Sequence, residues 1–176
     1  MAGTSYINLI PVSELTPGQA TRIRDSAITA LLAIAAKELN LSADKLVVRD
    51  IRADVDLDYT NEDWHEVTGA TANAYETMST GTMADQRWIG FFGVKDDEDC
   101  LSCTAIRFNV GGGDRAIIQL QALNGEDAMV GFFQSLIVIP PNAPYTISRY
   151  VRDANAATHL VLKGVVIEPR GKVVSP

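Results

Sequence analysis

The stretch TAIRFNV-GGGD-RAIIQLQAL, residues 104–123, decides the fold class. Its two flanking runs, 104–110 and 116–123, alternate apolar and polar residues, which is the two-residue period of a half-buried β-strand. The residues between them, Gly111 to Asp114, form a turn signal that joins two such strands into a hairpin. Neighbouring strands are therefore predicted to be antiparallel.

Further short strands are predicted on both sides of this hairpin, at Tyr6–Ile10, Leu46–Ile51, Arg87–Val94, Val130–Ile139, Tyr145–Val151 and His159–Ile167. The segment from Asn124 to Asp127 carries a second hairpin turn signal. Many short strands separated by frequent turns predict a mainly β protein, an antiparallel β-sandwich or jelly roll with one N-terminal α-helix.

That helix is predicted from Pro17 to Leu39. Thr16 is a suitable N-cap, proline suits the first helical position, and Gln19 completes a capping box. The run 27–36 has almost no polar face, and a helix that is apolar all round is a buried one. Its cover is predicted to come either from a neighbouring subunit or from the sheet and loops of its own chain.

Three other stretches stand out. In the first, Val55, Leu57 and Tyr59 alternate with aspartates, which predicts a strand with one acidic face. The segment 60–86 is rich in Thr, Ala and Gly and has no clear period, so it is predicted to be a long excursion that contacts another molecule. Finally, residues 89–92 and 130–133 resemble each other, either by coincidence or as equivalent strands of two facing sheets.

Composition sets the class of protein. The 176 residues suit a single domain, 1–176, in which the β core spans about 87–169, and 47% of them are hydrophobic. The net charge of −7 repels phosphate backbones, so no direct nucleic-acid contact is expected. The N-terminus has no basic stretch ahead of an apolar run, which predicts synthesis in the cytoplasm without a signal peptide. No apolar run approaches the ~20 residues of a membrane span.

Cys100 and Cys103 form a CxxC pair. Three interpretations of this pair are open: a redox pair, half of a zinc site or two ordinary buried thiols. The acidic run 95–99 before them would raise the thiol pKa, which disfavours redox chemistry. A zinc site needs four ligands and would have to recruit His65 and His159. Ordinary thiols are the favoured interpretation, so no metal or other cofactor is expected.

The acidic stretch also has the oxygen ligands of a candidate calcium site, because Asp54, Asp56 and Asp58 are followed by Asn61, Glu62 and Asp63. An EF-hand loop needs a glycine where Tyr59 stands and a glutamate where His65 stands. A solvated acidic face is therefore the favoured interpretation.

Residues 139–145 (IPPNAPY) resemble the second motif of the cupins, a family of jelly-roll metalloenzymes. Tyr145 occupies the place of the metal-binding histidine, and the first cupin motif is missing, so the resemblance implies a turn between strands without the metal chemistry. Asp153 and His159 were considered as spatial neighbours. Because the chain also lacks a nucleophile elbow, an HExxH helix and a phosphate loop, we predict no catalytic residues and no enzyme activity.

The run from Arg87 to Pro169 resembles, in its general style, the small single jelly-roll capsid and decoration proteins of bacterial and archaeal viruses. The resemblance implies a structural subunit of a virion, a homo-oligomer in contact with copies of itself and with other virion proteins. The candidate interface residues are Ile28, Leu32, Ala35, Trp64 and Tyr75.

Two alternatives stay open. The first is a carbohydrate- or ligand-binding β-sandwich that stacks its ligand on Trp64, Trp88 and Tyr75. The second is a degenerate cupin-like enzyme.

Overall fold

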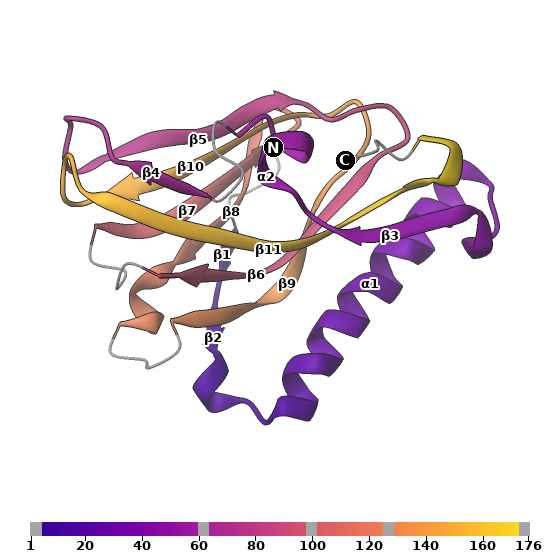
Figure 1. The fold of residues 1–176 in the computed structure, drawn as a ribbon, viewed down its shortest axis with the longest axis horizontal. Coiled ribbons are helices and arrows are strands. Elements are labelled where there is room, and N and C mark those ends of the chain that lie inside the picture. The colour runs from indigo at the N-terminus through magenta and orange to yellow at the C-terminus, as the bar shows by residue number, and fades with distance from the viewer. Residues whose placement is uncertain (1–4, 60–63, 98–101, 125–128, 173–176) are drawn as a thin grey trace.

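Two β-sheets face each other and a long helix covers the outer side of one of them (Figure 1). This computed structural model describes residues 5–59, 64–97, 102–124 and 129–172. The strands are β1 (Ser5–Ile7), β2 (Leu9–Pro11), β3 (Leu46–Asp50), β4 (His65–Val67), β5 (Ala74–Thr82), β6 (Trp88–Asp96), β7 (Cys103–Val110), β8 (Gly113–Gln119), β9 (Val130–Ile139), β10 (Pro144–Val151) and β11 (Ala157–Pro169). The helices are α1 (Pro17–Leu39) and α2 (Ala53–Asp56). Short 3-10 turns lie at Val12–Glu14, Ala43–Lys45, Leu120–Leu123 and Arg170–Lys172.

Sheet A has the strand order β1-β8-β7-β10-β5, and sheet B has the order β2-β9-β6-β11-β3, with β4 paired to β11. The prediction of a mainly β sandwich with one N-terminal helix is confirmed. Strands that are joined by a hairpin pair in antiparallel fashion, as β7 and β8 do through Gly111 and Gly112, which both have positive φ angles. One pair departs from the antiparallel rule, because β1 joins β8 in parallel.

The N-terminal segment belongs to both sheets. β1 forms the edge of sheet A, β2 forms the edge of sheet B, and Asn8 lies between the two strands. The Asn8 carbonyl accepts a hydrogen bond from the amide of Gln134 in β9 at 3.1 Å. A single extended segment therefore closes one side of the sandwich.

The main core lies between the two sheets. The Phe91 ring of sheet B meets the Phe108 ring of sheet A with 5.1 Å between centroids, and both residues are fully buried. A second apolar cluster lies on the opposite face of sheet B, beneath α1. Sheet B is thus buried on both faces, which explains why β6 has an almost continuous apolar sequence instead of an alternating one.

The predicted acidic strand at 54–59 is wrong. Residues 53–56 form the short helix α2, and Asp58 has a positive φ of 53°. The Asp56 carboxylate accepts a hydrogen bond from the amide of Arg52, and such a local side-chain bond to the backbone competes with a strand conformation. Asp56 is buried, so the prediction of a solvated acidic face fails for this residue.

The segment 60–86 has more regular structure than its sequence indicates, since it contains β4 and the nine-residue strand β5, while its contact with another molecule stays a prediction. Its two-residue period is broken by a bulge, because Ser79 and Thr77 pair with the adjacent residues Ile147 and Ser148 of β10. The repeated segments 89–92 and 130–133 lie in β6 and β9, which are neighbours in one sheet and not equivalent strands of facing sheets. The second predicted hairpin, at 124–127, falls mostly outside the described residues.

Candidate interaction surface

Local signals fix both ends of α1. The Thr16 hydroxyl accepts from the Gln19 amide at 3.3 Å, the Gln19 side chain accepts from the Thr16 amide at 2.8 Å, and Asn40 ends the helix in the left-handed region. The predicted helix and its capping box are thus confirmed. These caps satisfy some of the terminal backbone groups of α1 within the chain itself.

One stripe of α1 is buried against sheet B. Ala27, Leu31 and Ala35 lie on a cluster that includes Trp88, Phe92, Phe132, Val165 and Ile167. At Gly90 a Cβ atom would lie only 3.0 Å from a methyl group of Leu31, so the glycine permits the close approach of helix and strand. This contact sets the rotation of α1 on the sheet.

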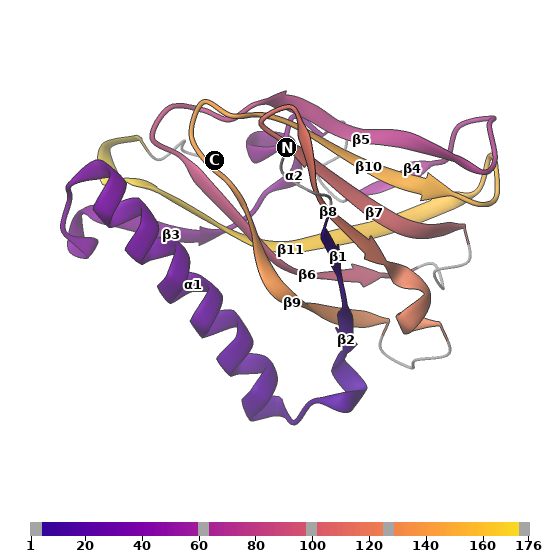
Figure 2. The same ribbon diagram turned by 180° about the vertical axis from the view of Figure 1, so that it is seen from behind.

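Three apolar residues of α1 outside the buried stripe remain exposed in the described part of the chain. Figures 1 and 2 show that the helix lies on one outer face of the sandwich and that no other element lies over it. Ala30 and Ala33 are exposed, and Ile34 has 41% of its surface in contact with solvent. We call these three residues the outer stripe of α1.

Grooves run along both flanks of the first half of α1. The groove toward β9 has a volume of about 670 Å³, and apolar side chains from both elements line it, among them Ile23, Phe133 and Leu136. The groove toward β11 has a volume of about 530 Å³, and its polar rim carries the Arg24–Asp50 ion pair. Phe92 contributes to both grooves.

The five predicted interface residues differ in their exposure to solvent. Ile28 and Leu32 are half-buried beside the cluster under α1, and Tyr75 is partly exposed. The prediction that Ala35 and Trp64 lie at an interface is wrong, because both residues are buried inside their own chain. Ala35 faces sheet B, and the Trp64 ring lies 5.1 Å from the Tyr59 ring in the main core.

The predicted set of three stacking aromatics does not exist on the surface, because Trp64 and Trp88 are both buried. Tyr75 instead meets Tyr150 edge-to-face at 5.2 Å, and the Arg107 guanidinium lies 4.0 Å from the centre of the Tyr75 ring. Sequence reasoning missed Tyr150 and Arg107. The alternation of apolar and polar residues along β10 and β7 indicates that both side chains face outward. Only the pairing of the strands shows that they meet Tyr75.

His65 and His159 are brought together by the pairing of β4 with β11, and their rings lie 6.1 Å apart. Cys103 is buried, and burial raises the pKa of its thiol to about 12, so the thiol stays protonated at neutral pH. Cys100 lies outside the described residues. Within the described part of the chain, no group of three or more His, Cys, Asp or Glu side chains is arranged to hold a metal ion.

Asp153 and His159 have different ion-pair partners in the structure. The Asp153 carboxylate pairs with Arg152 at 2.7 Å, whereas the His159 Nδ1 atom lies 3.3 Å from Asp97. Residues 139–145 form the predicted turn between strands, here β9 and β10, and Tyr145 is buried.

Two buried ion clusters hold the sandwich together, and sequence reasoning missed both. In the first, Arg49 and Arg87 alternate with Asp56 and Glu168, so that each arginine contacts both carboxylates. In the second, Arg149 of β10 contacts Glu66 of β4 at 2.5 Å and Glu76 of β5 at 3.0 Å. We call them the Asp56 cluster and the Arg149 cluster.

The Arg149 cluster predicts a pH dependence of stability. Burial raises the pKa of Glu66 above its ordinary value of 4.5, against the opposing effect of Arg149. A raised folded-state pKa adds stability below the unfolded pKa, and this contribution is lost as pH rises through the folded pKa. We therefore expect Glu66→Gln to become more stable relative to the natural protein as pH rises from 4.5 to 7, as measured by urea unfolding. Glu38→Gln, on the exposed side of α1, is the control, and an opposite trend would contradict this assignment.

No helix in the described part of the chain is both long and apolar enough to cross a membrane. No family model matches the sequence, and no curated protein is similar to it. One solved structure with some similarity is the functional form of the mosquito-larvicidal Cry4Aa toxin from Bacillus thuringiensis. The two chains are 11% identical with a TM-score of 0.31, over 73% of this chain and 24% of the toxin chain. The aligned part is about a quarter of the toxin, and a similarity this low assigns neither family nor function.

Proposed function

We propose that this protein is a structural subunit of a viral particle and that it acts through protein–protein contacts made by the outer stripe of α1. One observation carries the proposal: the run 27–36 of α1 is almost entirely apolar, yet Ala30, Ala33 and Ile34 within it are exposed. The viral assignment comes from the general resemblance of the run from Arg87 to Pro169 to the small single jelly-roll capsid and decoration proteins of viruses. The proposed place of action is the virion.

Several features support contact with another protein as the role of this surface. An exposed apolar patch with a polar rim is typical of a protein contact. Ala30 and Ala33 are small, Ile34 is the largest apolar side chain of the outer stripe, and Arg22 and Arg24 lie toward the N-terminal end of α1. The net charge of −7 favours protein partners over nucleic acid.

A carbohydrate- or ligand-binding role is the second candidate, and Tyr75 is the observation that favours it. The ring is 36% exposed and is held in place by Tyr150 and Arg107. A single exposed ring gives less stacking area than the three aromatics first expected, so this role ranks below the assembly role.

Replacing Ile34 with glutamate tests the assembly role. Ile34 is preferred to Leu32 because Leu32 also contacts the core under α1, and a charge there would disturb folding. We expect the natural protein to form oligomers in size-exclusion chromatography with light scattering. We expect Ile34→Glu to weaken their association by about tenfold or more, as for a central interface residue.

Val67→Glu is the matched control, because Val67 is another exposed aliphatic residue and lies on β4. Both variants should keep the circular dichroism spectrum of the natural protein. A natural protein that stays monomeric at every concentration, or an Ile34→Glu variant that assembles normally, would refute the role of the outer stripe.

A further inference from the structure

β9 has a partner strand along only part of its outer edge. β2 pairs with Gly131–Phe133, and the Asn8 carbonyl accepts from the Gln134 amide, but β9 continues to Ile139. No described strand pairs with residues 135–139 on that side. A strand edge of about five residues thus presents backbone groups that are suited to another strand.

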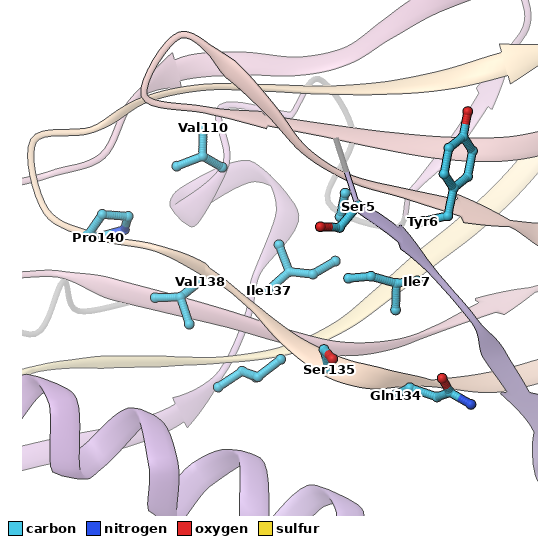
Figure 3. A pocket seen from close by; sticks show the side chains of 11 residues that line it. Ser5, Tyr6, Ile7, Val110, Gln134, Ser135, Ile137, Val138 and Pro140 are labelled. Carbon is cyan, nitrogen blue, oxygen red and sulfur yellow. The ribbon is translucent and has the colours of Figure 1, made fainter. Parts of the chain in front are cut away.

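This edge borders a cavity of about 510 Å³ between the two sheets. Figure 3 shows the side chains of Ile7 and Ile137 pointing toward each other across it, while Tyr6 points away. Val110 and Ala116 of sheet A complete the apolar lining, whereas the Val138 side chain lies on the other face of β9, toward α1. The volume is within the range of ~300–1,000 Å³ that is typical of ligand sites.

The edge of β9 carries no charge or internal proline to protect it, although its ladder with β6 is irregular between Phe132 and Ile137. Natural edge strands usually carry lysine, an inward charge or an internal proline, which prevent a second chain from pairing with them. The chain has no charged residue between Val130 and Ser148, and β9 itself contains no proline. None of the residues that line the cavity is charged. An edge of this kind suits an uncharged partner that forms backbone hydrogen bonds.

We propose that residues 135–139 of β9 accept an extended, uncharged peptide segment of another protein as an added strand. The backbone of that segment pairs with β9, and its alternate apolar side chains enter the cavity between Ile7 and Ile137. This site is separate from the outer stripe of α1, and it does not depend on the role proposed for that stripe.

Hydrogen exchange with a peptide probe tests the proposal. The probe is an acetylated and amidated copy of residues 5–11 (SYINLIP), the segment of this chain that already pairs with β8 and β9. At a peptide concentration of ten times Kd, exchange of those backbone amides of residues 135–139 that face the open edge is expected to slow about tenfold. Ser135→Lys adds an exposed charge at the edge and should abolish the effect. Thr77→Lys, on the exposed face of β5, should not.

A second peptide, N-methylated at alternate residues, separates strand addition from simple burial of side chains. It is made in two forms, methylated at the odd or at the even residues, and strand addition predicts that the form whose methyl groups face β9 does not bind while the other form does. Equal binding of the two forms, or no slowing at residues 135–139, would overturn the proposal. It would also fail if the peptide displaced β2, which would speed exchange at residues 131–134, or if the protein dimerised through β9 without peptide.

Discussion

Replacement of Arg149 by alanine is expected to destabilise the fold by about 3–5 kcal/mol, the effect of breaking a buried ion cluster. Arg149 is 1% exposed and is the largest fully buried side chain among the described residues. Its guanidinium donates to the Thr158 hydroxyl at 2.5 Å and to Glu76 at 3.0 Å. Without the arginine, Glu66 and Glu76 would face each other with no compensating charge, and a cavity would remain.

Guanidinium chloride unfolding measures this effect, and Arg152→Ala is its matched control. Arg152 is also an arginine paired with a carboxylate, but its side chain is 48% exposed, so its loss should cost at most about 1 kcal/mol. A triple variant, Arg149→Met with Glu66→Gln and Glu76→Gln, removes the three charges together and should recover much of the lost stability. If Arg149→Ala unfolds at the same denaturant concentration as Arg152→Ala, the cluster does not stabilise the fold.

The strands could be predicted wherever residues alternate without interruption. β7 and β10 follow the two-residue period, and turn residues mark their ends, so their predicted bounds nearly match the structure. β5 could not be predicted, because the bulge at Met78 changes which residues face the core. The same difficulty affects α2, whose alternating aspartates fit a strand pattern although Asp56 holds the backbone in a turn of helix.

The candidate surfaces could be predicted only in part. The apolar character of α1 was visible in the sequence, but the side of the helix that faces the sheet depends on Gly90 and its contact with Leu31. Arg149 lies on the same side of β10 as Tyr145 and Ile147, so the two-residue period of this strand indicates a buried side chain at position 149. Its partners come from three other strands, and no spacing in the sequence reveals them.

The unpaired edge of β9 could not be predicted at all. The sequence shows an uncharged strand, but whether such a strand lies at an edge depends on the length of its neighbour. Here β2 is three residues long and β9 is ten. The difference in length between two strands that are far apart in the sequence creates the site.

Replacement of Asp56 by alanine is the second change expected to cost about 3–5 kcal/mol, because it removes half of the negative charge in a buried cluster. The Asp56 carboxylate accepts two hydrogen bonds from Arg49, both at 2.6 Å, and lies 3.4 Å from Arg87. Without it, the two arginines would share only Glu168, while the Arg52 amide would lose its acceptor at the start of α2. The variant therefore affects both the cluster and the short helix.

The matched control for this variant lies in the same turn of helix. Asp54→Ala changes an exposed aspartate two residues earlier in α2, so the loss of charge is identical and the cluster stays intact. Surface substitutions of this kind usually change the free energy of unfolding by less than about 0.5 kcal/mol. The difference between the two variants in urea unfolding thus isolates the buried contacts of Asp56. Equal free energies of unfolding would mean that Arg49 and Arg87 are solvated without Asp56, which would contradict a rigid, water-excluding cluster at this end of the sandwich.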